Sequence, residues 1–168
     1  MEKGISIPEK ILHLRTIQIF EGLSVAEMAA VASITEEVLY PKGTVIIKEG
    51  EKGETMYMII EGEVSVIKGS PAGPEVVLDK IRAGDYFGEM ALFEDLVRSA
   101  TIRTEQDTRV LVLDKREFTE IVREYPLIAL HICKVLSQRL RKLHERVRVY
   151  DDQPAPEASA PLVTNPQT

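Results

Sequence analysis

Residues 87–102, FGEMALFEDLVRSATI, hold the side chains in this chain that are best suited to bind a charged small molecule. Gly88 has no Cβ, so a ligand can approach the backbone closely there, and the short segment after it can aim free N–H groups at an anion. Arg98 carries a guanidinium, which forms charge-assisted hydrogen bonds to phosphate oxygens. Glu89, which only accepts hydrogen bonds when ionised, can receive one from a sugar hydroxyl. The pattern predicts a site for a small phosphate attached to a hydroxyl-bearing sugar.

Three histidines and one cysteine are the other side chains that could carry chemistry. His13, His131 and His144 have no carboxylate or cysteine partner at ligand spacing, so we expect no metal site. Cys133 is the single cysteine, which excludes a disulfide framework, and we expect it to be a small buried apolar residue. The sequence contains no nucleophile motif, P-loop or dinucleotide fingerprint. We therefore expect a binding protein and not an enzyme.

The composition is that of a globular protein. A chain of 168 residues, 44% hydrophobic and 29% charged, is long enough for one domain with a core and adjoining helices. Its net charge of -6 argues against general binding to nucleic acid, so we expect no nucleic-acid partner. No apolar stretch approaches the roughly 18 residues of a membrane helix, and the N-terminus lacks a continuous apolar segment. We expect no membrane association and a cytoplasmic location.

Strand-like runs punctuated by glycine occupy the middle of the chain, after helical segments. Helices are expected over residues 8–20 and from a capping box at Ser24 and Glu27 to about Ala32. A hairpin turn is expected at Glu61 and Gly62. The strand-like runs cover residues 38–40, 44–48, 56–60, 63–68, 76–81, 100–104 and 109–113. Their spacing is typical of a β barrel or sandwich.

Helical signals return at Asp114, which forms a second capping pattern with Glu117, and predict a helix to about Glu124. Residues 127–150 contain no proline or glycine and predict one long helix. This helix can dimerise through an apolar seam with alternating steps of four and three, or the first part of the seam can pack on the β domain. The seam consists of Ala129, Cys133, Leu136, Leu140, Leu143, Val147 and Tyr150.

Four segments follow from these signals. We expect an N-terminal helical segment over residues 1–37 and a β-roll that contains the binding stretch over residues 38–113. C-terminal helices are expected over residues 114–150. Residues 151–168 are rich in proline and small polar residues, so they predict a disordered tail.

Two blocks of this sequence resemble the cyclic nucleotide-binding domain family, which includes the catabolite activator and the kinase A regulatory subunit. Residues 87–92, FGEMAL, followed after five residues by RSATI, resemble the family's phosphate-binding cassette. Residues 46–62, IIKEGEKGETMYMIIEG, resemble its glycine-punctuated barrel signature. The resemblance covers about residues 10–148. It implies a mainly β fold with flanking helices, namely an eight-stranded β jelly-roll barrel (double-stranded β-helix) with N-terminal helices and a long C-terminal helix.

The resemblance also implies roles for the cassette residues. It assigns Glu89 to the ribose 2′-hydroxyl and Arg98 to the cyclic phosphate. Backbone N–H groups near Gly88, Ala91 and Ala100 would complete the cradle. The alternative is that Glu89 and Arg98 form an ion pair on the surface beside a turn.

Base recognition is expected to involve residues after the phosphate site. Ser99 can add a hydroxyl to phosphate or base, and Arg139 falls where the catabolite activator has a base-facing arginine. Leu143 and His144 depart from the polar pair of that protein, so Leu140 or Leu143 is instead a candidate apolar cover for the purine. The ligand-binding residues implied in this way are Phe87, Gly88, Glu89, Met90, Ala91, Leu92, Arg98, Ser99, Ala100, Arg139 and Leu143.

The function implied by the resemblance is a sensor or regulatory module that binds cAMP or cGMP, with cAMP favoured, and requires no metal. We expect it to signal to an unidentified effector protein through the helix over residues 127–150. One alternative is a transcription regulator of the catabolite-activator type that lacks its own DNA-binding domain, because residues 151–168 are too few for a helix-turn-helix. Another is a ligand-free module for dimerisation or docking.

Overall fold

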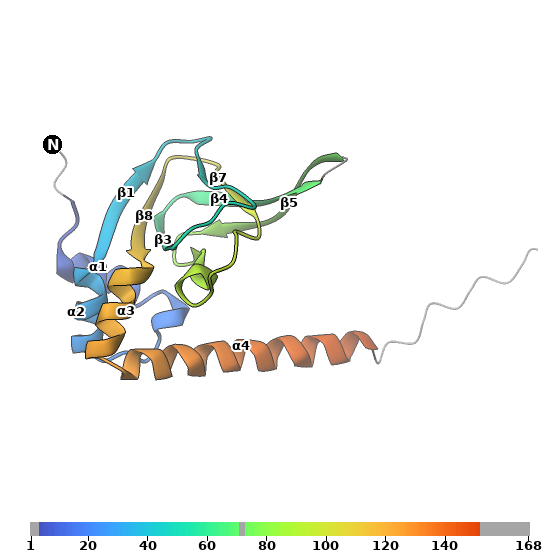
Figure 1. The fold of residues 1–168 in the computed structure, drawn as a ribbon. Helices are drawn as coiled ribbons and strands as arrows, with labels where there is room; N and C mark the ends of the chain where they lie inside the picture. Colours follow the sequence, from blue (N-terminus) through green and yellow to red (C-terminus); the bar gives the residue numbers. More distant parts are fainter. Residues whose placement is uncertain (1–3, 71–72, 152–168) are drawn as a thin grey trace, which may run out of the picture. The chain divides into compact units, whose positions relative to one another are not determined.

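The computed structural model describes residues 4–70 and 73–151, and Figure 1 shows the course of the chain. The chain divides into two compact units, Met1–Val135 and Leu136–Thr168. The first unit contains all the strands of the described chain and the predicted cassette. The expected disordered tail lies outside the described residues, except for Asp151, which ends a helix.

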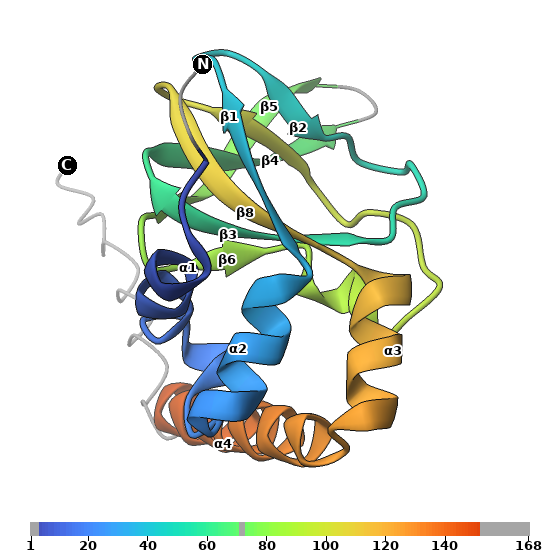
Figure 2. The same cartoon turned by 90° about the vertical axis from the view of Figure 1, so that its left-hand side faces the viewer.

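Two four-stranded antiparallel sheets confirm the mainly β jelly-roll fold (Figures 1 and 2). The first sheet has the order β1 (Thr35–Tyr40), β8 (Thr108–Asp114), β3 (Thr55–Glu61) and β6 (Tyr86–Phe87). The second has the order β2 (Val45–Ile47), β7 (Thr101–Thr104), β4 (Glu63–Ser70) and β5 (Gly73–Arg82). Within the described residues no strand of one sheet pairs with a strand of the other. The sheets therefore face each other without closing into a barrel.

Seven of the eight strands coincide with the runs expected from the sequence, and β6 is the one that the pattern missed. Its residues Tyr86 and Phe87 pair with Met58 and Tyr57 of β3. A strand of two residues is too short to show an alternating pattern, so periodicity cannot reveal it. β6 matters because it delivers the chain directly to Gly88.

The prediction of a hairpin at Glu61 and Gly62 was wrong. The turn there joins β3 to β4, but β3 pairs with β6 and β8, whereas β4 pairs with β5 and β7. A glycine signals that the chain turns but does not specify which strands pair afterwards. The turn therefore carries the chain from one sheet to the other, and β4 with β5 forms the hairpin.

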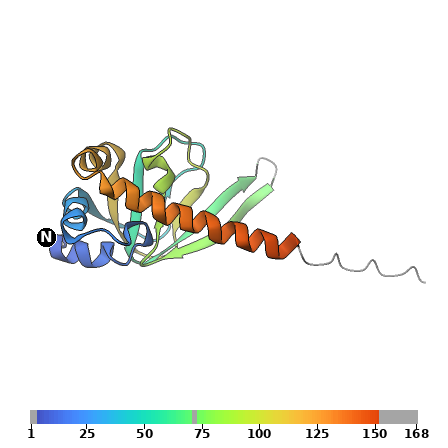
Figure 3. The same cartoon turned by 90° about the horizontal axis from the view of Figure 1, so that it is seen from below.

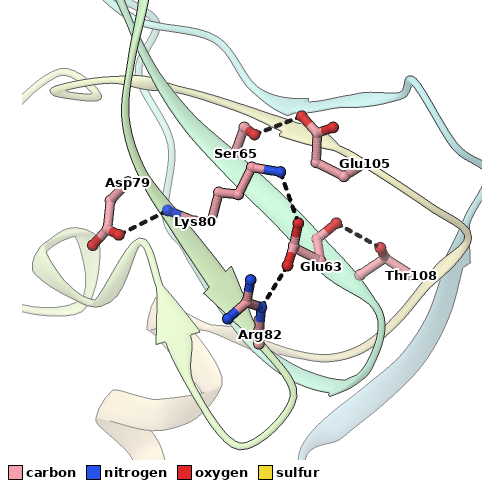
Figure 4. Close-up of polar contacts among 7 residues, drawn as sticks. All are labelled: Glu63, Ser65, Asp79, Lys80, Arg82, Glu105 and Thr108. Carbon is pink, nitrogen blue, oxygen red and sulfur yellow. Dashed lines mark hydrogen bonds and ion pairs between the residues drawn. The ribbon is translucent and has the colours of Figure 1, made fainter.

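A polar cluster fixes β4 against its neighbours (Figure 4). The Glu63 carboxylate accepts hydrogen bonds from Lys80 Nζ and Arg82 Nε, and these bonds lower the pKa of Glu63. Ser65 Oγ donates to Glu105 Oε1 over 2.5 Å. Opposite charges on paired strands stabilise that pairing, so this cluster supports the β4–β5 register.

Local capping explains where the helices begin. The expected helix over residues 8–20 is α1 (Ile7–Leu14) followed by the short 3-10 helix η1 (Gln18–Phe20). The second predicted helix is confirmed as α2 (Val25–Ser33), where Ser24 Oγ accepts from Glu27 N and Ser24 N donates to the Glu27 carboxylate. The third is confirmed as α3 (Lys115–Glu124), capped by Asp114. These helices gather at one end of the strands (Figure 2).

Two hydrophobic clusters hold the first unit together, and β3 contributes to both. Met56 and Met58 belong to the cluster shared with the helices, whereas Tyr57 and Ile59 belong to the cluster between the sheets. This division follows from the alternation of side chains along a strand. β3 is therefore a central strand, buried on both faces.

The long predicted helix is confirmed as α4 (Leu127–Asp151), which is continuous in Figure 3. Its first turns bury Ile128, Ile132 and Val135, not the first residues of the predicted seam. Cys133 is exposed, so its expected burial was wrong. Cys133 lies about 100° around the helix from Ile132, because a helix has about 3.6 residues per turn. The packed face thus uses the same steps of four and three, shifted by one residue.

Candidate functional site

The predicted cassette begins where β6 ends. Gly88 has a φ of 75° and forms the N-cap of a short 3-10 helix, η2 (Glu89–Leu92). A Cβ added at Gly88 would lie 2.8 Å from Arg98 Nη1 and 3.0 Å from the carbonyl oxygen of Thr55. Both the left-handed backbone and these close contacts require glycine. The glycine brings η2 against the arginine that follows ten residues later.

Arg98 is held in place by main-chain and side-chain hydrogen bonds. Its N–H donates to Glu51 O and its carbonyl accepts from Gly50 N, so its backbone is tied to the loop after β2. Its Nη2 donates to Thr55 O at 2.9 Å and Thr55 Oγ1 at 3.1 Å, and its Nη1 to Gly88 O at 3.4 Å. The guanidinium is therefore fixed by neutral oxygen atoms.

Partial burial lowers the pKa of Arg98 from its ordinary value, because removal from water disfavours the charged form. Arginine nevertheless stays protonated in proteins. Among the ion pairs of the described residues, none involves Arg98 or Glu89, so the alternative of an ion pair between them is not observed. A half-buried cation and a nearby carboxylate are thus both available to a ligand.

Arg98 and Glu89 line one cavity of about 350 Å³. Apolar side chains of the second sheet, among them Val66 and Ile81, form part of its wall. The lining residues are Ile47, Val66, Ile81, Tyr86, Phe87, Gly88, Glu89, Met90, Ala91, Glu94, Leu96, Val97, Arg98, Ser99, Ala100 and Ile102. The cavity therefore combines an apolar wall with a few charged groups, as small-molecule sites usually do.

Most of the expected ligand-binding residues meet at this cavity. The structure brings together Phe87, Gly88, Glu89, Met90, Ala91, Arg98, Ser99 and Ala100. Leu92 instead packs in the core shared with the helices, with 5% of its surface exposed. Arg139 belongs to the second unit, as does Leu143, whose side chain lies outside the described part of the chain. Their roles toward the base stay predictions.

Sequence reasoning missed the residue that orients Arg98. The Arg98 side chain donates to three acceptors, and Thr55 supplies two of them, its carbonyl oxygen and its hydroxyl. The Thr55 hydroxyl in turn donates to Tyr57 Oη at 3.0 Å. Tyr57 in turn stacks on Phe87, with ring centroids 5.0 Å apart. Thr55 lies inside the glycine-punctuated block over residues 46–62, so the sequence marked that block as part of the domain. It did not indicate that Thr55 contacts Arg98, because the two residues are 43 positions apart. Of the eight wall residues that were missed, four lie on strands of the second sheet, namely Ile47, Val66, Ile81 and Ile102.

Comparison with known proteins identifies the family. The family model described as "Cyclic nucleotide-binding domain" matches residues 37–125, which include β1 to β8 almost completely and the whole cavity lining. The chain belongs to the cyclic nucleotide-binding domain family. The expectation drawn from the two sequence blocks is confirmed at the level of the family.

Two curated relatives of this cyclic nucleotide-binding domain are regulatory proteins by name. The "Cyclic AMP receptor protein" of Thermus thermophilus is 32% identical over 124 residues, which cover 74% of this chain and 57% of that protein. The "cAMP-dependent protein kinase regulatory subunit" of Mycosarcoma maydis is 37% identical over 114 residues, covering 65% of this chain and 22% of that protein. This chain therefore spans only part of the length of either relative.

Solved structures share the fold of this cyclic nucleotide-binding domain. The crystal structure of the Thermus thermophilus catabolite activator protein has a TM-score of 0.69 and 29% identity, covering 80% of this chain and 63% of that chain. The regulatory domain of Toxoplasma gondii PKA, solved with cAMP, has a TM-score of 0.66 and 26% identity, covering 74% of this chain and 48% of that chain. Both support the jelly-roll assignment.

Across residues 4–70 and 73–151, no group of three or more His, Cys, Asp or Glu side chains is arranged to hold a metal ion. Within the same described residues, no helix combines the length and apolar character that crossing a bilayer requires.

Proposed function

We propose that this chain is a regulatory module whose cavity binds a cyclic nucleotide, with cAMP preferred to cGMP. The observation that carries the proposal is the arrangement of Arg98, a half-buried guanidinium held by neutral oxygens beside a cavity of about 350 Å³. Small-molecule sites commonly have volumes of about 300–1,000 Å³. An anionic ligand would supply the negative partner that Arg98 does not find among the described residues.

Arg98, Glu89 and the backbone of the cassette have separate roles in this proposal. Arg98 pairs with the cyclic phosphate through charge-assisted hydrogen bonds. Glu89, at the start of η2, accepts a hydrogen bond from the ribose 2′-hydroxyl. The N–H of Ala100 adds a donor to the phosphate, and Gly88 permits the close approach. The N–H of Ala91 donates to Gly88 O at 3.2 Å, so it would share its hydrogen with the phosphate. The ligand leaves chemically unchanged.

The preference for cAMP is supported by the names of the relatives. The Thermus thermophilus protein is called a cyclic AMP receptor, and the Mycosarcoma maydis protein a regulatory subunit of a cAMP-dependent kinase. Ser99 lines the cavity directly after Arg98 and is suited to contact phosphate or base. cGMP is the second candidate, because a serine hydroxyl can also accept a hydrogen bond from the guanine amino group.

The output of the module is proposed to pass through α4. A ligand shifts a conformational equilibrium only through different affinities for the two states, so residues of α4 must contact the ligand or the cassette in one of them. Arg139 and Leu143 are the proposed contacts with the base. The exposed Leu136 and Leu140 are candidates for a homodimer contact along the seam, and an effector protein of unknown identity reads the state of the helix.

Isothermal titration with cAMP, cGMP and linear 5′-AMP tests the proposal directly. We expect both cyclic nucleotides to bind with Kd values of about 1 µM or below, corresponding to about 8 kcal/mol, and cAMP to bind more tightly. Linear 5′-AMP should bind much more weakly. The absence of both heat and thermal stabilisation with either cyclic nucleotide would reject the receptor function.

A further inference from the structure

Lys68 reaches the cassette from a neighbouring strand. β4 pairs with β7 from Val64 to Ile67, and Lys68 is the next residue along β4. Its Nζ donates to the carbonyl oxygen of Ser99 over 2.7 Å. Ser99 directly follows Arg98 and lines the cavity. A side chain of β4 is therefore bonded to the main chain of the cassette.

Glu49 fixes the position of this lysine. Its Oε1 lies 2.6 Å from Lys68 Nζ, and its Oε2 accepts from Gly69 N at 2.9 Å. The N–H of Glu49 donates to Thr101 Oγ1 at 3.0 Å, which anchors the carboxylate's own backbone to β7. Hydrogen bonds from Lys68 and Gly69 lower the pKa of Glu49, so it remains ionised at neutral pH. The lysine charge is therefore compensated before any ligand arrives.

Because a peptide group is planar, the bond from Lys68 to the Ser99 carbonyl also sets the direction of the Ala100 N–H. In a trans peptide the C=O of one residue and the N–H of the next point in opposite directions. Because the Ser99 carbonyl is bonded to Lys68, the N–H of Ala100 points away from Lys68. Ser99 and Ala100 both line the cavity, so the orientation of the peptide between them determines which polar atom faces the ligand.

We propose that Lys68, held by Glu49, is a positioning residue that orients the peptide between Ser99 and Ala100 so that the Ala100 N–H faces the phosphate of the bound nucleotide. This inference rests on the proposed function. It assigns Lys68 no direct contact with the ligand, since its ammonium is already shared between the Glu49 carboxylate and a carbonyl.

Three variants of the full chain separate positioning from simple charge attraction. Lys68→Met removes the bond to Ser99, and we expect the Kd for cAMP to rise by about 5- to 10-fold, the equivalent of one hydrogen bond. Glu49→Gln keeps the lysine charge but releases the ammonium, and we expect weaker binding as well. If Lys68 attracted the phosphate directly, Glu49→Gln would instead tighten binding. Lys68→Arg should keep most of the affinity of the unmodified chain, because a guanidinium can bond to both Glu49 and the Ser99 carbonyl.

The matched control is Lys80→Met. Lys80 lies on the adjacent strand β5, pairs with Glu63 at 2.9 Å and is 46% exposed, compared with 48% for Lys68. Neither lysine lines the cavity, but the ammonium of Lys80 bonds to Glu63 of β4, whereas that of Lys68 bonds to Ser99 of the cassette. Lys80→Met should change the Kd for cAMP by less than about 2-fold, because an exposed ion pair contributes little. The unfolding temperature of the ligand-free protein should be similar for Lys68→Met and Lys80→Met.

A second measurement distinguishes oriented donors from a general loss of stability. The two phosphorothioate diastereomers of cAMP place sulfur at different exocyclic positions of the phosphate, so they respond differently to one N–H donor. We expect Lys68→Met to change the ratio of their affinities, whereas destabilisation alone would weaken both equally. An unchanged ratio, or equal Kd values for Lys68→Met and Lys80→Met, overturns the inference while leaving the receptor function intact. Failure of the unmodified chain to bind any cyclic nucleotide overturns both.

Discussion

Replacement of Arg98 by alanine tests how the cavity holds an anion. The guanidinium is oriented by Thr55 and Gly88 and shares no ion pair with a carboxylate of the described residues. Its charge is therefore free to pair with a phosphate in a partly desolvated site. Truncation of one member of such a pair costs about 2–5 kcal/mol, which is about 30- to 5,000-fold in Kd. We expect Arg98→Ala to raise the Kd for cAMP within this range in isothermal titration.

Replacement of an arginine outside the cavity, Arg103, serves as the control because it removes the same charge. Arg103 lies on β7 and pairs with Glu75 at 2.9 Å, but it does not line the cavity. Arg103→Ala should change the Kd by less than about 3-fold, because exposed ion pairs contribute little. Arg98→Lys should fall between the two alanine variants, since an ammonium keeps the charge but loses the forked geometry.

If Arg98→Ala binds cAMP as tightly as the unmodified chain, the guanidinium does not hold the phosphate. If Arg103→Ala loses as much affinity as Arg98→Ala, the effect reflects the general field of the protein and not a specific contact. Ligand-free unfolding temperatures should accompany both titrations, since Arg98→Ala also leaves the carbonyls of Thr55 and Gly88 without this donor.

Three further predictions concern the sugar, the fold and the seam. Glu89→Gln should weaken cAMP binding less than Arg98→Ala, since an amide oxygen still accepts from the ribose hydroxyl; equal losses in titration would contradict this. The lowered pKa of Glu63 contributes stability above the unfolded pKa of about 4.5 that is lost as the pH falls through the lower folded value. Glu63→Gln should therefore make the unfolding temperature fall less steeply below about pH 4.5. An unchanged decline would show that Glu63 does not contribute to the loss of stability in acid. Leu140→Glu should give monomers in sedimentation if the seam forms a homodimer, and an unchanged mass would exclude the seam as the contact.

The features that the sequence predicted well are those determined by near neighbours in the chain. The capping box at Ser24 and the cap at Asp114 act within three residues, and both helices begin where these signals place them. The cassette is similarly compact, so Gly88, Glu89 and Arg98 could be assigned to one site from their spacing. The structure brings all three to one cavity.

The features that the sequence did not predict depend on contacts between distant residues. Thr55 meets Arg98 across 43 positions, and Lys68 meets Ser99 across 31. The helical period gave the length of α4 but not its buried face, because the rows that contain Ile128 and Cys133 both follow helical spacing and differ by one residue. Ile128 and Ile132 pack in the cluster that includes Met28 of α2 and Met56 of β3, and helical spacing alone does not say which row faces that core.

The charges around the cavity explain why the orientation of a few donors should matter so much. Among the described lining residues, Arg98 is the one cation, whereas Glu89 and Glu94 are acids. Lys68 adds no free charge because Glu49 compensates it. The net charge of -6 gives the protein as a whole no long-range attraction for an anionic ligand. Binding must therefore depend on short-range donors held in fixed directions, which is the task that Thr55 performs for Arg98 and that Lys68 is proposed to perform for the Ala100 N–H.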